Sequence, residues 1–267
     1  MSVPWASSGA IKIERAKEHL GNLVTEIQAF MKSSPYGSVT EDDTERGEWV
    51  FRAVVPQEPP PRWGAIVGDT IHNLRSALDI LWRAVFPTGT KDANRRDPFP
   101  FFQSSDAFEH RFRRVKNTTQ QRVVDILRGA KPYKGGNKYL WALHVLDAED
   151  KHHLLLPVGI AVPNIITNTV SFPMLPFPMP FKSPRINISF VRPLPTPVYP
   201  VHHGTELYRL PINPEGPQVD MNQKFSFGIA FGEGEVMEGE AIVPTLRQFT
   251  NVVDGLVQSF IGAGLLI

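Results

Sequence analysis

The chain of 267 residues contains no cysteine. This absence excludes disulfide bonds, thiolate zinc sites and cysteine nucleophiles, and because it fits a reducing compartment we expect a cytoplasmic protein. The chain also lacks an excess of positive or negative residues, since its formal net charge is +1. The overall charge therefore does not favour a nucleic-acid partner. No apolar run reaches the roughly 18 residues of a membrane span, and the first residues lack the apolar core of a secretory signal. We therefore expect no membrane partner.

Hydrophobic residues make up 42% of the chain, as is typical of a globular protein. Prolines concentrate in residues 157–217, so this part is not expected to form long helices. Helical periodicity appears elsewhere. It marks residues 10–32, 62–86, 105–129 (as two helices), 137–151 and 244–262. Residues 33–47 are polar and interrupted by Pro35 and Gly37, which predicts a loop.

Short apolar or alternating segments predict β-strands. They cover residues 49–55, 154–163, 164–172, 185–191, 205–210 and 224–231, with a turn near Pro163 and Asn164 joining the second segment to the third. The sequence therefore predicts an α+β protein in which a helical layer packs on a mainly antiparallel β-sheet. The expected single domain, 1–267, has a helical part at about 10–151, a sheet part at about 152–240 and a C-terminal helix at about 244–262.

The most strongly periodic segment is Gly64–Phe86, which predicts the central helix. Beside its apolar face, His72, Arg75 and Asp79 fall in one narrow sector at about 100° per residue, while Asn73 points elsewhere. Polar groups next to a buried face must be paired, hydrated or functional. The simplest interpretation is an Arg75–Asp79 pair, worth about 0.2–0.5 kcal/mol on an exposed helix.

A second helix, Tyr139–Lys151, repeats this spacing with His144, Asp147 and Lys151. Asp150 lies at the edge of the same face, and His152 and His153 follow the helix. If the two helices pack together, the two polar lines meet in a shared cluster.

Three functions remain open for this cluster. The first is a binding or accessory protein in which the cluster is a buried network that fixes the two helices. The second is a hydrolase- or nuclease-like enzyme with a general acid–base site; its candidate catalytic residues are His72, Arg75, Asp79, His144, Asp147 and Asp150. The third is a metal-binding protein using the same residues, although the chain has neither an H-E-x-x-H nor an E-x-x-H motif. No cofactor and no metal ligand set is assigned.

Further candidate binding residues are Asn73, Lys151, His152, Lys134 and Lys138. Lys134 and Lys138 flank two glycines in K-P-Y-K-G-G-N-K, residues 131–138, where backbone N–H groups can cradle a phosphate. A turn between two helices requires the same glycines, and the P-loop spacing is absent. The basic helix face at 110–114 is a candidate surface for an anion or nucleic acid, against the more common interpretation of a solvated face.

Three segments together carry a resemblance that covers roughly residues 64–155. H-N-L-R-S-A-L-D at 72–79, P-F-P-F at 98–101 and L-H-V-L-D-A-E-D-K-H at 143–152 resemble a group of uncharacterised bacterial proteins with an H-N-L-R-x-x-L-D helix and a later D-K-H-R element. His153 stands where that group has arginine. The resemblance implies that the two polar lines belong together and implies no activity. Small helical ribonucleases of the HEPN type carry an arginine followed by a histidine on one helix; here His72 precedes Arg75, so the similarity is in helical placement without the motif.

Overall fold

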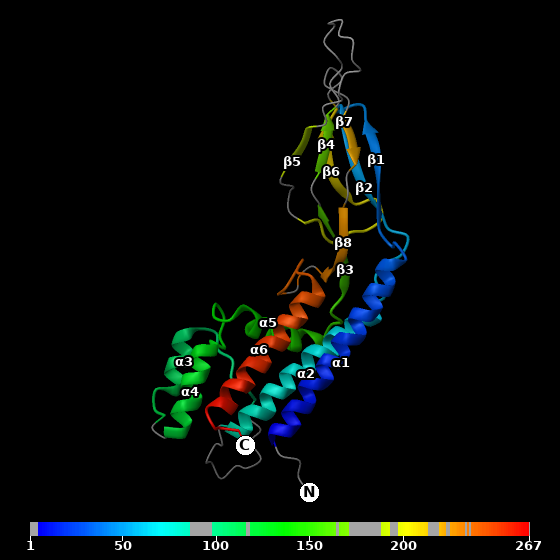
Figure 1. Ribbon diagram of the computed structural model, residues 1–267. Helices are drawn as coiled ribbons and strands as arrows, with labels where there is room; N and C mark the ends of the chain where they lie inside the picture. Colours follow the sequence, from blue (N-terminus) through cyan, green and yellow to red (C-terminus); the bar gives the residue numbers. More distant parts are fainter. Residues whose placement is uncertain are drawn as a thin grey trace, which may run out of the picture. The chain divides into compact units, whose positions relative to one another are not determined.

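The computed structural model describes residues 5–85, 98–115, 118–163, 166–170, 188–192, 197–212, 219–222, 225–232, 234 and 236–266. Helices dominate the first half, strands follow, and a helix ends the described chain, which confirms the predicted α+β class (Figure 1). Contacts divide the chain into two compact units. We call them the helical unit, residues 1–28, 60–157 and 231–267, and the strand unit, residues 29–59 and 158–230. The single domain expected from the sequence stays a prediction.

The helices lie mainly in the helical unit. They are α1 (Trp5–Lys32), α2 (Arg62–Val85), α3 (Ser105–Phe112), α4 (Thr118–Ala130), α5 (Lys138–Asp150) and α6 (Ile242–Gly262). Their bounds agree with the predicted ranges to within one or two turns. Asn137 caps α5, because its Oδ1 accepts hydrogen bonds from the backbone N–H groups of Tyr139 and Leu140 at 3.1 and 3.0 Å. None of the described helices is long and apolar enough to cross a membrane.

Helix α2 is the centre of the helical unit, packing against both α5 and α6. Helix α1 lies beside it and runs antiparallel (Figure 1): Gly9 lies against Leu81, whereas Trp63 Nε1 donates to Glu26 Oε2 at 2.7 Å. The apolar face predicted for α2 is the core of this unit. Each of its residues is at most 3% exposed: Val67, Ile71, Leu74, Leu78, Leu81 and Val85.

The segment before α3 contributes to the same core without forming a helix. Phe99 is 1% exposed and packs edge-on against Trp82, while Phe101 and Phe102 are half-buried. Burial of aromatic rings next to α2 explains why this short proline-flanked segment is apolar. It also brings Phe101 to the polar side of α2.

The strands lie mainly in the strand unit. They are β1 (Gly37–Asp43), β2 (Glu48–Val54), β3 (Pro157–Pro163), β4 (Ile166–Val170), β5 (Ile188–Arg192), β6 (Glu206–Pro211), β7 (Val219–Asn222) and β8 (Phe225–Phe231). The strand orders are β1-β2-β6, β3-β8 and β5-β4-β7. The pairs of β2 with β1 and β6, and of β4 with β5 and β7, are antiparallel.

The described strands differ from the sequence-based expectation in three ways. Residues 37–43 form strand β1 rather than part of a loop, in register with β2 from Gly37 opposite Val54 to Asp43 opposite Glu48. The two strands expected on either side of a turn near Pro163 do not pair with each other in the described strand orders, since β3 pairs with β8 while β4 pairs with β5 and β7. Strand β7 was not predicted. Residues 164, 165, 171, 172, 185–187 and 224 of the predicted strands, and Asn164 of the predicted turn, lie outside the described residues.

Candidate functional site

The two predicted polar lines meet where α2 packs on α5. His72 Nδ1 lies 3.0 Å from Asp147 Oδ1, and Lys151 Nζ lies 2.7 Å from Asp147 Oδ2. The Asp147 side chain is only 6% exposed, whereas those of His72 and Lys151 are 54% and 57% exposed. A buried carboxylate is stable only when it is well paired. Here each oxygen of Asp147 has one basic partner, and both partners reach solvent.

Arg75 and Asp79 form a separate ion pair on α2. Asp79 Oδ1 also accepts a hydrogen bond from the backbone N–H of Phe99 at 2.8 Å, and Arg75 Nη2 donates to the Phe99 carbonyl at 3.2 Å. The Arg75 side chain is 8% exposed. The pair therefore clamps both backbone groups of Phe99, and it holds residues 98–102 against α2. This clamp is more than the simple helical pair that the sequence predicted.

His144 does not join either ion pair. Its imidazole stacks on Phe101, with ring centroids 4.3 Å apart and planes at 6°, and Arg75 Cζ lies 5.0 Å from the centroid of the same Phe101 ring. Burial lowers the pKa of His144, and the charge of Arg75 lowers it further. A neutral imidazole fits this position beside an aromatic face and a cation.

Asp150 lies against α2 at Gly68, where a Cβ would collide with its carboxylate. Burial raises the pKa of Asp150, and the negative charges of Asp147 and Asp69 raise it further. Gly68 thus permits the close approach of the Asp150 carboxylate.

Asn73 faces α1 rather than α5. Its Oδ1 accepts a hydrogen bond from Lys12 Nζ at 3.2 Å, and its Nδ2 donates to the Asp69 carbonyl at 2.7 Å. Asn73 thereby connects α2 to α1 and does not join the cluster around Asp147.

The glycines at 131–138 are explained by the turn that they form. Gly135 has φ +82°, and a Cβ at Gly136 would collide with the Lys131 carbonyl. Lys138 Nζ is 2.6 Å from Glu240 Oε1, so this candidate phosphate ligand already has an acidic partner. A phosphate site using Lys134 and Lys138 stays a prediction.

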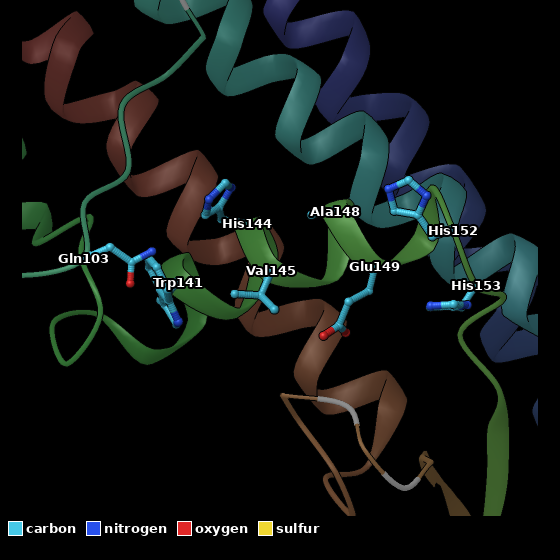
Figure 2. A pocket seen from close by; sticks show the side chains of 8 residues that line it. All are labelled: Gln103, Trp141, His144, Val145, Ala148, Glu149, His152 and His153. Carbon is cyan, nitrogen blue, oxygen red and sulfur yellow. The ribbon is translucent and has the colours of Figure 1, made fainter.

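A groove of about 370 Å³ runs along α5 (Figure 2). Its lining residues are Gln103, Trp141, His144, Val145, Ala148, Glu149, His152 and His153. Figure 2 shows Trp141 beside Gln103 at one end, and Glu149 and the two consecutive histidines towards the other. Oε2 of Glu149 is buried and has no hydrogen-bond partner among the described residues. Burial raises the pKa of Glu149, and the charge of His153 opposes this effect.

The described residues contain no group of three histidine, aspartate or glutamate side chains placed to hold a metal ion. The histidines and carboxylates considered as metal ligands lie mainly in three separate places: around Asp147, at the clamp on Phe99, and in the groove along α5. The basic face of the α3 region is exposed, as expected. Its members are His110, Arg111, Arg113 and Arg114.

A scan against protein-family models, a search of curated proteins and a search of solved structures each found no match to the chain. The site is therefore interpreted from its own geometry. That geometry brings His72, Asp147 and Lys151 together, joins Arg75 to Asp79, and leaves His144 and His152 in the groove.

Two residues that complete these sites were not predicted from the sequence: Ser76 and Glu149. Ser76 follows His72 by four residues and so was within reach on a helix. Glu149 lies four and eight residues after Val145 and Trp141, a spacing that places all three along one side of α5. Phe101 belongs to the P-F-P-F segment of the resemblance, but its stack on His144 could not be predicted because its position depends on the clamp at Phe99.

Proposed function

We propose that this is a binding protein in which the polar network between α2 and α5 fixes the helices, and the groove along α5 holds the ligand. The observation that carries the proposal is the Glu149 carboxylate, which lines the groove and has a buried oxygen without a partner among the described residues. An unsatisfied buried acceptor costs about 1–3 kcal/mol. A ligand with a hydrogen-bond donor removes this cost when the Glu149 side chain turns this oxygen toward the groove.

The opposite end of the groove favours a flat group. The indole of Trp141 and the imidazole of His144 lie edge to face with centroids 5.6 Å apart, and both line the groove. Residues 141 and 149 are eight apart on α5, which is a separation of about 12 Å along the axis. The groove therefore suits a short molecule with an aromatic or apolar group at one end.

The charge at the Glu149 end favours a cation. Glu149 is one residue from the last residue of α5, where the free carbonyl groups of a helix carry partial negative charge. An amidinium or ammonium group gains from both the carboxylate and this dipole. The proposed ligand class is thus a small aromatic or apolar cation.

Benzamidine and benzoate are matched probes, because they share a flat ring and differ in charge. Titration followed by NMR should give a benzamidine Kd on the order of 1 mM, and no saturable shift with benzoate. Glu149→Gln should weaken benzamidine binding at least tenfold. Ala148→Trp fills the groove from an exposed position and should abolish it, whereas Ala107→Trp, at an exposed position of α3, should not.

Equal binding of the two probes would contradict the charge assignment. Benzamidine binding that survives Ala148→Trp would contradict the groove itself.

A cytoplasmic location and an anionic partner for the basic face at 110–114 are secondary proposals. The cysteine-free composition supports the first, and the exposure of His110, Arg111, Arg113 and Arg114 supports the second. Retention on heparin that falls when Arg111, Arg113 and Arg114 are changed to glutamine is the expected result.

A further inference from the structure

A hydroxyl, an imidazole and a carboxylate follow one another at the junction of α2 and α5. Ser76 Oγ lies 3.4 Å from His72 Nε2, and His72 Nδ1 lies 3.0 Å from Asp147 Oδ1. Ser76 and His72 are one turn apart on α2, and Asp147 comes from α5. This order is the one that nucleophilic catalysis by serine requires, although apo distances to the nucleophile are often longer than in the reacting complex.

The Asp147 carboxylate fixes the tautomer of the His72 ring. An ionised carboxylate only accepts hydrogen bonds, so Nδ1 of His72 carries the hydrogen that it donates to Asp147. In the neutral ring, Nε2 is then unprotonated. It faces Ser76 and can accept the hydroxyl proton.

The Ser76 hydroxyl differs from four other hydroxyls in the described helices. Thr25, Thr70, Thr250 and Ser259 each donate to the backbone carbonyl four residues earlier. That bond is the usual one for a hydroxyl inside a helix. Ser76 instead directs its Oγ to the side chain of the residue four positions earlier, His72, which is the interaction that activates a serine.

The exposure of His72 and Asp147 also fits their proposed roles. His72 is 54% exposed, so a substrate can reach it, while Asp147 is 6% exposed and held by two helices.

We propose that Ser76 is the nucleophile of an acyl-transfer site that hydrolyses small carboxylic esters, with His72 as general base and Asp147 as the positioning residue. Ser76 Oγ attacks the ester carbonyl carbon while His72 Nε2 takes the hydroxyl proton. The bond to the alcohol oxygen breaks, and His72 returns the proton to the leaving alcohol. Water then attacks the acyl-serine through the same base, which releases the carboxylic acid and restores Ser76.

A fluorophosphonate probe tests this site on the intact protein, independently of the groove along α5. Peptide mass spectrometry should locate the adduct on Ser76. Ser76→Ala should abolish labelling, and His72→Gln should slow it about 100-fold. Ser76→Ala removes only the Ser76 hydroxyl and should melt as the parent protein does, whereas His72→Gln removes one basic partner of the buried Asp147 carboxylate and should have a lower Tm, so its labelling is measured well below that Tm. Ser259→Ala is the matched control and should label at the parent rate.

A conservative variant tests the positioning role of Asp147. Asp147→Asn removes the carboxylate that accepts the Nδ1 hydrogen of His72 and should slow labelling. Asp147→Glu keeps a carboxylate and should restore part of the labelling rate. No adduct on Ser76, an unchanged rate in His72→Gln, or equal rates in the two Asp147 variants would each overturn the proposal.

Discussion

The imidazole of His144 lies flat on the ring of Phe101, with the two planes at 6°. Phe101 belongs to the segment that Arg75 and Asp79 clamp through Phe99, so this stack connects α5 to the clamp on α2. The site described above is thus organised by two connections between α2 and α5. One is the direct hydrogen bond between His72 and Asp147, and the other is the aromatic stack, which reaches α2 through the clamp at Phe99.

Replacing His144 by phenylalanine should remove part of the acid sensitivity of the fold. The pKa of His144 lies below its ordinary value of 6.5 because the ring is buried and close to Arg75. A histidine with a lowered pKa stabilises the fold above pH 6.5, and this stabilisation is lost as the pH falls through the lowered value. Thermal melts between about pH 7 and pH 5 should show the parent losing Tm relative to His144→Phe. The exposed change His110→Phe should leave the pH dependence of the parent intact.

Asp150→Asn should raise the Tm at neutral pH. Burial and the charges of Asp147 and Asp69 raise the pKa of Asp150 above 3.8, so ionisation is unfavourable in the folded protein. The stabilisation from the protonated form is present below pH 3.8 and is lost as the pH rises through the raised pKa. The gain in the variant should therefore disappear in acid. Asp254→Asn is the control, since Asp254 is paired with Lys17 at 3.1 Å and its neutralisation should give no gain.

Arg75→Met should destabilise the protein by about 3 kcal/mol, because it leaves Asp79 without its cation in a partly buried position. Arg128→Met removes ion pairs to Glu109 and Asp125 on an exposed surface and should cost at most about 1 kcal/mol. Urea denaturation of both variants makes the comparison. If the two variants lost similar free energies of unfolding, the Arg75–Asp79 clamp on Phe99 would contribute no more to stability than an exposed ion pair does.

Gly64→Ala should destabilise the fold, whereas Gly21→Ala should stabilise it. A Cβ at Gly64 would collide with the Leu155 carbonyl, a backbone atom that cannot move aside independently. Gly21 lies within α1 with nothing within 4 Å of an added Cβ. Alanine there gains about 0.5–1 kcal/mol from helix propensity. Chemical denaturation should give opposite signs, and a gain in Gly64→Ala would contradict the close packing of α2 on residues 154–155.

The helices and the polar line on each of them could be predicted, because both depend on periodicity within one helix. That α2 packs on α5 could not be predicted in the same way. The spacing of His72 on α2 and of Asp147 on α5 placed each beside an apolar face, and two such faces bring their edges together when they pack. The partner of each atom could not be predicted. Arg75 bonds the carbonyl of Phe99, and His144 stacks on Phe101, through a segment whose path no local pattern defines.

The strand errors have a related cause. Strand β1 is the outer strand of its sheet, and its residues from Ser38 to Asp42 are mainly exposed, so it lacks the alternation that marks a half-buried strand. The pairing of β3 with β8 joins segments separated by the other strands. Pairings of this range depend on the whole chain, which short sequence windows do not represent.

The arrangement of the helical unit also has a consequence for biosynthesis. Helix α2 packs on α6, although residues 86–241 are synthesised between them. At translation rates of about 5–20 residues per second, synthesis of the intervening residues takes about 8–30 seconds, and α2 emerges that long before α6. During that time its apolar face has no α6 to cover it, which makes this face a natural binding surface for chaperones on the nascent chain.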